Sequence, residues 1–123
     1  MKIKWYMALA PTFLLILPLI MLFSSREGSA QVSPEVRIIF EGGPGDAMDN
    51  AIVIKGAPNN QQGIDAEYYY LEKKFGRFKV DWKLNKQRLL HKGNKKFDLM
   101  QIELKDGTRK DIYFDITDFF GKL

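Results

Sequence analysis

The residue types that nucleophilic catalysis requires are scarce in this sequence. The chain contains no cysteine and a single histidine, His91, and after Ala30 its one serine is Ser33. Serine and cysteine hydrolases need a nucleophile that a neighbouring base activates, and zinc sites are built mainly from histidine and cysteine. We therefore expect neither a hydrolase of this kind nor a zinc site.

Carboxylates are the remaining groups for acid–base chemistry. Asp111 and Asp115 flank Tyr113 on one face of a predicted strand, and Asp118 follows its end. Catalysis by such a pair requires that burial raise the pKa of one member. Alternation with apolar residues instead predicts solvated acids that protect an edge strand from aggregation. We therefore predict a protein that is not an enzyme and uses no cofactor.

The segment 41–50 combines glycines with acidic residues. Its oxygen ligands could gather around calcium, but their spacing is not that of an EF-hand, and "GGPG" is not followed by the Lys-Ser or Lys-Thr pair of a phosphate-binding loop. We interpret the segment as a mobile acidic loop without a metal. The residues weighed as calcium ligands are Glu41, Asp46, Asp49 and Asn50.

The stretch 73–96 is strongly basic. It carries ten basic residues against one acidic residue, Asp81, with aromatic residues between them. Such a surface can bind an anionic polymer by releasing counterions, although lysines on a solvated strand face can also serve only to block edge pairing. The candidate binding residues here are Lys73, Lys74, Arg77, Lys79 and Lys83, with Tyr70 beside them.

The first thirty residues have the layout of a secretory signal peptide. Lys2 and Lys4 precede an apolar run at 7–23, and small residues lead to Ala30,. The alternative is an uncleaved membrane anchor, because a run of 17 residues lies at the lower limit of a bilayer span,. In either case we expect an exported domain, periplasmic or secreted. We expect no nucleic acid partner, and membrane contact only if the segment is uncleaved.

The exported part has the length of one domain. Removing 30 of the 123 residues leaves 93, enough for one modest core,. Without cysteine this core must hold by packing, with no disulfide. We divide the chain into a signal or anchor at 1–30, an N-terminal strand and acidic loop at 31–50, and an α+β domain at 51–123.

The segment "GIDAEYYYLEKKFG", residues 63–76, predicts one amphipathic helix. Asn59 or Asn60 can cap its start and Gly76 follows its end,. The predicted core face repeats at helical spacing and includes one of three consecutive tyrosines, whereas Tyr70 lies about 200° away and is assigned to the flank or surface. The core face consists of Ile64, Tyr68, Leu71 and Phe75.

After Gly76 the apolar residues alternate with a period of two. Three strands follow, and in each the even-numbered positions are apolar. Short strands at 36–41 and 51–56 precede the helix, and whether 36–41 joins the sheet is open. The core positions are Val80, Trp82 and Leu84, then Met100, Ile102 and Leu104, then Ile112, Phe114 and Ile116.

These elements predict an α+β fold, with one amphipathic helix packed on a curved antiparallel sheet. The sheet would be a three-strand meander plus one or two short N-terminal strands. One helix followed by three strands resembles cystatin-like folds in element order only, because the glutamine-valine-glycine hairpin of cystatins is missing. Shared faces predict the register. The expected pairs are Trp82 with Leu104, Leu84 with Ile102, Arg88 with Asp98 and, across a three-residue loop, Ile102 with Ile112.

The outer face of the predicted sheet also carries apolar residues. Phe97, Leu99 and Tyr113 share it by parity and form a patch that the strand 36–41, the C-terminal segment or a partner would cover. We expect a small exported, non-enzymatic binding domain that interacts with a protein, in the manner of an inhibitor. The alternative is a binder of an anionic envelope polymer or membrane surface through the basic stretch 73–96.

Overall fold

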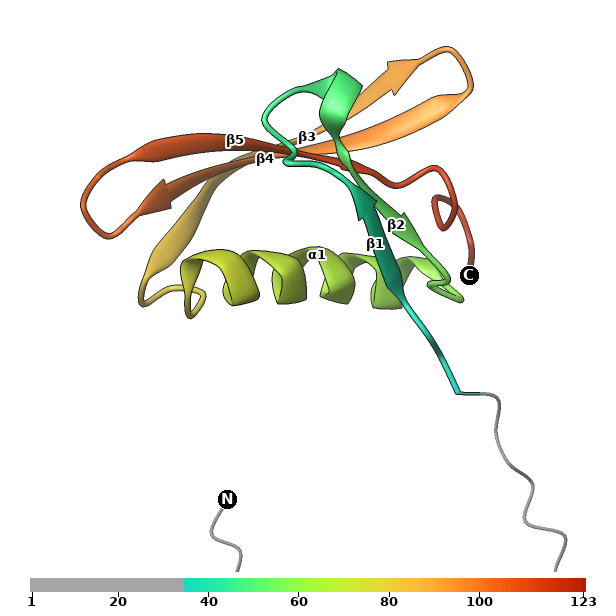
Figure 1. Cartoon of the computed structure of the whole chain (residues 1–123), viewed down its shortest axis with the longest axis horizontal. Helices are drawn as coiled ribbons and strands as arrows, with labels where there is room; N and C mark the ends of the chain where they lie inside the picture. Colours follow the sequence, from blue (N-terminus) through green and yellow to red (C-terminus); the bar gives the residue numbers. More distant parts are fainter. Residues whose placement is uncertain (1–34) are drawn as a thin grey trace, which may run out of the picture. The chain divides into compact units, whose positions relative to one another are not determined.

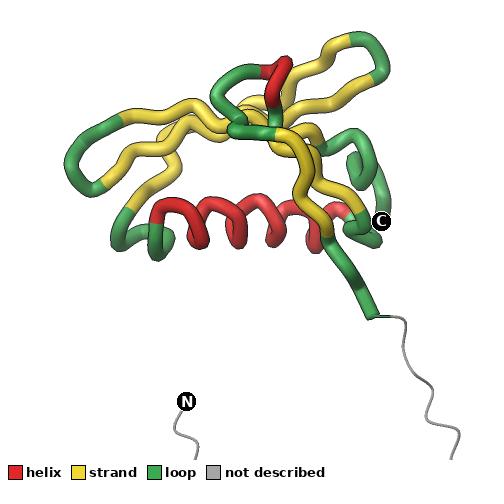
Figure 2. Tube along the Cα trace, in the orientation of Figure 1, coloured by secondary structure: helices red, strands yellow, loops and turns green. Residues whose placement is uncertain are grey.

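The computed structural model describes residues 35–123, in which one helix packs under a five-stranded sheet (Figure 1, Figure 2). The predicted signal peptide or anchor lies outside these residues. Within residues 35–123, no helix is long and apolar enough to cross a membrane. In chain order the elements are β1 (Ile39–Gly42), the short 3-10 helix η1 (Met48–Asn50), β2 (Ile52–Lys55), α1 (Asn60–Phe75), β3 (Trp82–Lys92), β4 (Lys95–Leu104) and β5 (Arg109–Asp115).

The strands are arranged in the order β1-β2-β5-β4-β3. The predicted α+β fold is confirmed: α1 covers one face of the sheet, and β3, β4 and β5 form an antiparallel meander. The sheet is mixed, because β2 runs parallel to β5, with Ile52 opposite Phe114. β1 pairs with β2 at one edge, so the segment whose place was open in the sequence belongs to the sheet.

Helix α1 begins and ends where its capping residues predict. The side chain of Asn59 accepts a hydrogen bond of 2.9 Å from the backbone N–H of Gln62. At the other end the N–H of Gly76 donates to Glu72 O over 3.0 Å, and Gly76 adopts a φ of 104° that favours glycine,. Both ends therefore satisfy backbone groups that the helix leaves free.

The buried face of α1 differs from the predicted one. Gly63, Ala66, Glu67 and Leu71 are buried, whereas Ile64 is exposed. The reason lies far along the chain, because the ring of Phe119 occupies the space beside Gly63 that a Cβ atom would fill. The helix therefore turns its small residues, not Ile64, toward the C-terminal segment.

The three tyrosines lie in three environments. Tyr68, the predicted core tyrosine, is half-buried and its ring centroid lies 5.1 Å from that of Phe78. Tyr69 is exposed. Tyr70, assigned to the flank or surface, is also half-buried and meets the buried ring of Phe114 edge-on at 5.7 Å. Tyr70 therefore supports the core and offers little free surface.

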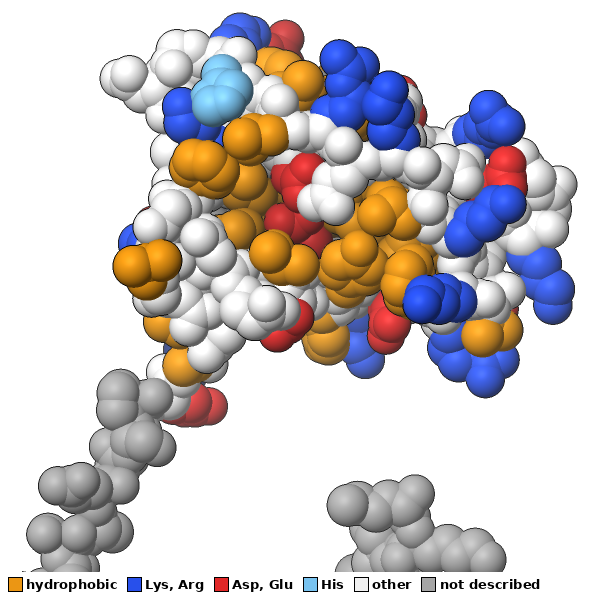
Figure 3. All heavy atoms as spheres, turned by 180° about the vertical axis from the view of Figure 1, so that it is seen from behind, with side chains coloured by type: hydrophobic (Ala, Val, Ile, Leu, Met, Phe, Trp, Pro, Cys, Tyr) orange, Lys and Arg blue, Asp and Glu red, His pale blue; other side chains and the backbone are white. Residues whose placement is uncertain are grey.

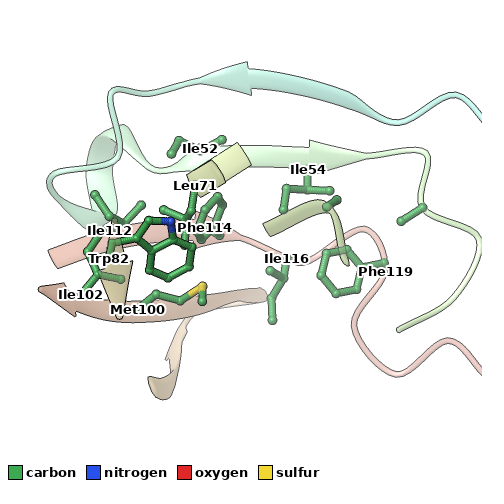
Figure 4. Packing of buried hydrophobic residues seen from close by; sticks show 12 residues of the cluster. Ile52, Ile54, Leu71, Trp82, Met100, Ile102, Ile112, Phe114, Ile116 and Phe119 are labelled. Carbon is green, nitrogen blue, oxygen red and sulfur yellow. The ribbon is translucent and has the colours of Figure 1, made fainter. Parts of the chain in front are cut away.

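The even-numbered positions predicted as core lie beneath the sheet (Figure 4). Val80 is the exception, since it lies in a turn before β3 and is half-exposed. The loop of the last hairpin has the predicted three residues but begins one residue earlier, because the N–H of Leu104 donates to Thr108 O over 2.8 Å and closes the loop at 105–107. Met100, not Ile102, therefore lies opposite Ile112.

A β-bulge in β3 changes the register halfway along the strand. Trp82 lies opposite Leu104 and Leu84 opposite Ile102, as predicted. Asn85 is then an extra residue, and beyond it the pairing shifts,. The predicted pair of Arg88 with Asp98 is therefore wrong. Leu89 lies opposite Asp98, and Arg88 lies opposite Leu99 on the outer face, away from α1,.

The acidic loop expected to be mobile is held against the outer face. The N–H of Gly45 donates to Asn50 O over 2.8 Å, and Gly45 O accepts from Tyr113 N–H at 2.7 Å. Asp49 bonds Lys92 over 2.9 Å. The loop thus reaches from β5 to the end of β3, over the face where Phe97 and Leu99 are buried. It belongs to the same compact unit as residues 51–123.

Gly63→Ala tests the packing of α1 against Phe119. Replacing glycine by alanine in an exposed helix stabilises by about 1 kcal/mol, but here the new methyl group overlaps the ring, and overpacking costs about 1–3 kcal/mol. We expect a net loss of up to about 2 kcal/mol in the free energy of urea unfolding. In a Phe119→Leu background the same change should cost less. An increase in stability on Gly63→Ala alone contradicts this packing.

Candidate functional site

A groove opens between the first half of α1, the middle of β3 and β4, and the C-terminal segment. Its volume is about 480 Å³. Figure 3 shows acidic side chains in a hollow with hydrophobic side chains around it. The mouth is apolar, because Ile64, Leu89 and Phe120 are all exposed there. The lining residues are Asn60, Ile64, Glu67, Gln87, Leu89, Asp98, Ile116, Phe119 and Phe120.

Two carboxyl groups form the bottom of this groove. Glu67 from α1 is 1% exposed and Asp98 from β4 is 7% exposed. The side-chain amide of Gln87 donates a hydrogen bond to Asp98. Within residues 35–123, no donor group reaches either oxygen of Glu67. An ionised Glu67 would therefore be a buried charge without a hydrogen bond, which is a costly state.

Burial and the neighbouring acid keep Glu67 protonated. Loss of water, which is the largest cause, a hydrogen bond to Asp98 and the charge of Asp98 together raise the pKa of Glu67 to about 10. Burial also raises the pKa of Tyr68, with smaller effects of Glu67 and Asp98. At neutral pH Glu67 is thus a carboxylic acid that donates a hydrogen bond to Asp98. Ionised Glu67 would have no proton to donate, so this hydrogen bond would be lost.

The bulge in β3 explains why no positive side chain of residues 35–123 lies beside Glu67 and Asp98. Arg88 would oppose Asp98 on the inner face if the register continued unbroken, but beyond Asn85 it lies on the outer face and Leu89 takes its place,. The groove lining between residues 35 and 123 contains no lysine, arginine or histidine. The acid pair is therefore enclosed by apolar and neutral polar side chains.

This arrangement can do two things chemically. The two carboxyls can share one proton, as paired acids do when like charges cannot both ionise. They can also accept hydrogen bonds from a cation that enters the groove. Within the described part of the chain, no three His, Cys, Asp or Glu side chains are placed to hold a metal ion.

The basic candidate residues lie at the other end of α1 and are exposed. Two of them form ion pairs, Arg77 with Asp81 at 3.7 Å and Lys83 with Glu103 at 2.9 Å. The other three lie over aromatic rings. Lys73 is 5.4 Å from the centroid of Tyr69, Lys74 is 5.9 Å from that of Tyr70, and Lys79 is 5.4 Å from that of Phe78.

The apolar candidates on the outer face are not free surface. Phe97 and Leu99 are buried and Tyr113 is half-buried, because the loop 43–50 lies over this side of the sheet. The acids weighed for catalysis each make a separate structural bond. Asp111 accepts from Gln101, Asp115 from Thr117 and Asp118 from the N–H of Gly56, at 3.1, 2.6 and 3.0 Å.

Sequence reasoning missed Glu67, Asp98 and Gln87, although two signals were present. Asp98 shares the even parity of Met100 and Ile102, which places it on the apolar face. Glu67 lies four residues from Gly63 and four from Leu71, on one stripe of the helix,. Gln87 carried no signal, because it faces inward only beyond the bulge.

Comparison of the chain with known proteins identifies no relative. The chain matches no protein-family model, no curated protein and no solved structure. The fold therefore defines its class in general terms, as an α+β domain with one helix on a five-stranded mixed sheet.

Glu67→Gln tests whether Glu67 is protonated when folded. The folded pKa of about 10 lies above the ordinary value of 4.5, so the folded state holds more protons between these values and wild-type stability falls as pH rises through them. Glutamine does not titrate. At pH 7 the variant should be the more stable by on the order of 3 kcal/mol, and this difference should nearly vanish by pH 5.

Urea unfolding of both proteins at pH 5, 6 and 7 measures this difference. Glu72→Gln, the same change at an exposed position of α1, is the control and should show little pH dependence relative to wild type. A stability difference for Glu67→Gln that stays constant from pH 5 to pH 7 would mean that Glu67 is ionised in the folded protein.

Proposed function

We propose that this protein is a small exported binding domain without catalytic activity of its own, and that it takes its ligand in the groove between α1 and the sheet. The observation that carries the proposal is the apolar mouth of that groove. Ile64, Leu89 and Phe120 come from three different elements and are exposed around one hollow.

Several properties of the groove support binding. Exposed apolar side chains gathered in one place commonly mark interaction sites, whereas single ones need no explanation. A volume of about 480 Å³ falls within the range of about 300–1,000 Å³ typical of ligand pockets. Most of the lining side chains belong to α1, β3 and β4, and these regular elements favour a preformed site,.

Export is part of the same proposal and rests on the first thirty residues. Their basic start, apolar run and small-residue end are typical of a secretory signal,. A protein that works outside the cytoplasm, periplasmic or secreted, meets soluble ligands, envelope components and other exported proteins. Binding one of these requires no nucleophile, metal or cofactor.

Leu89→Ser tests the groove as the binding site. The exported protein, expressed from the full chain, should bind the neutral apolar dye Nile red with enhanced fluorescence. Removing the leucine side chain should weaken this binding about tenfold or more, since burying it contributes about 1.5–3 kcal/mol. The control is Val80→Ser, because Val80 is 50% exposed and Leu89 46%, but Val80 lies in the turn before β3. Equal dye binding by both variants would remove the groove from consideration.

A second candidate function has one observation in its favour. Lys73 and Lys74 in the last turn of α1 and Lys79 shortly after it are exposed, and among residues 35–123 no ion pair engages them. This surface suits an anionic envelope polymer or membrane surface, the alternative that the basic stretch suggests.

Salt dependence separates this function from groove binding. If the basic surface is the site, heparin should bind at low salt with an affinity that falls steeply as salt rises. The double change Lys73→Glu and Lys79→Glu should abolish that binding. Arg37→Glu with Lys122→Glu, which changes the net charge equally elsewhere, should weaken it only slightly. Equal loss in both variants would indicate attraction to net charge without a site.

A further inference from the structure

Glu67 is an acceptor without a donor at the bottom of the groove. Its side chain is 99% buried, it lines the hollow, and within residues 35–123 neither oxygen receives a hydrogen bond. Protonated Glu67 donates to Asp98, but its oxygens accept from no donor in the described part of the chain, and buried acceptors in folded proteins nearly always have one,. A ligand that brings N–H donors into the groove would supply the missing partner.

We propose that the groove binds a small amphiphilic amine, with its ammonium group against Glu67 and Asp98 and its apolar body against Leu89 and Phe119. This inference rests on the proposed function, because it names the ligand class of the same groove. An ammonium group has three donors, and the two carboxyls offer four oxygens, of which one already accepts from Gln87.

The charges around the site favour a cation. Asp98 faces Glu67 from β4, Tyr68 is its neighbour on α1, and β3 contributes only the neutral amide of Gln87. The C-terminal segment adds apolar side chains alone. With no positive side chain in the described lining, a ligand cation is the group that would neutralise the pair.

The mouth of the groove favours a small amphiphile over a lysine side chain of a partner protein. Ile64, Leu89 and Phe120 surround the entrance with apolar surface. A lysine would place its polar backbone against this surface, whereas an alkyl chain would bury methylene groups there. Each buried methylene contributes about a fourfold gain in affinity, so affinity should grow with chain length.

Binding should release a proton. An ammonium group prefers the ionised form of Glu67, which is protonated in the free protein, so the proton leaves as the ligand enters,. Affinity for the amine should therefore rise between pH 6 and pH 8, by up to about tenfold per pH unit for one released proton. A neutral ligand of the same length should bind without this dependence.

Isothermal titration calorimetry of the exported protein with octylammonium, octan-1-ol and octanoate tests the proposal. We expect octylammonium to bind at least tenfold more tightly than octan-1-ol and octanoate to bind weakest, with proton release at pH 7 that shows in buffers of different ionisation enthalpy. Glu67→Gln should lose at least tenfold in affinity for the amine and keep its affinity for the alcohol. Glu72→Gln, the exposed control on the same helix, should bind like wild type.

Three outcomes would overturn the inference. If the amine and the alcohol bind equally, the groove is simply apolar, and the proposed function stands while the ligand class fails. If Glu67→Gln binds the amine as well as wild type does, the acid pair is not the site. If N-acetyl-lysine amide binds more tightly than octylammonium, the occupant is a partner's lysine. Equal Nile red binding by Leu89→Ser and Val80→Ser, measured separately, is the result that would remove the proposed function itself.

Discussion

The extra residue in β3 determines which side chains face the helix. Up to Leu84 the even positions of this strand point toward α1, and beyond Asn85 the odd positions do. One inserted residue therefore exchanges Arg88 for Leu89 opposite Asp98. An ion pair of Arg88 with Asp98 is thereby replaced by an apolar wall, and the lack of a cation in the described lining of the groove depends on that exchange.

An acid pair in such surroundings is maintained at a cost. Ionising Glu67 would bury a charge without a hydrogen bond, so the folded protein retains the proton instead,. A leucine at this position would pack against the core with no such cost. Groups that lower stability, such as a buried acid, are found mainly where they serve a function. The surrounding core, which includes Trp82 and Phe114, is large enough to tolerate the buried Glu67.

Much of the fold follows from local sequence, and most of the site does not. The caps at Asn59 and Gly76 and the even parity of the strands are properties of neighbouring residues, so composition and period predict them. The bulge at Asn85 leaves no such trace, because one added residue changes register without changing the pattern of residue types nearby. The face that α1 buries depends on Phe119, which is distant in sequence, so helical periodicity alone placed Ile64 inside.

The end of the chain is fastened to the start of the helix. The N–H of Asn60 donates to Lys122 O over 2.9 Å, and the Asn60 side chain accepts from the N–H of Gly121 at 3.0 Å. Phe119 fits against Gly63 in the same region. Residues about sixty positions apart in the sequence thus pack together. In related sequences positions 63 and 119 should therefore vary together, a larger residue at one accompanying a smaller residue at the other.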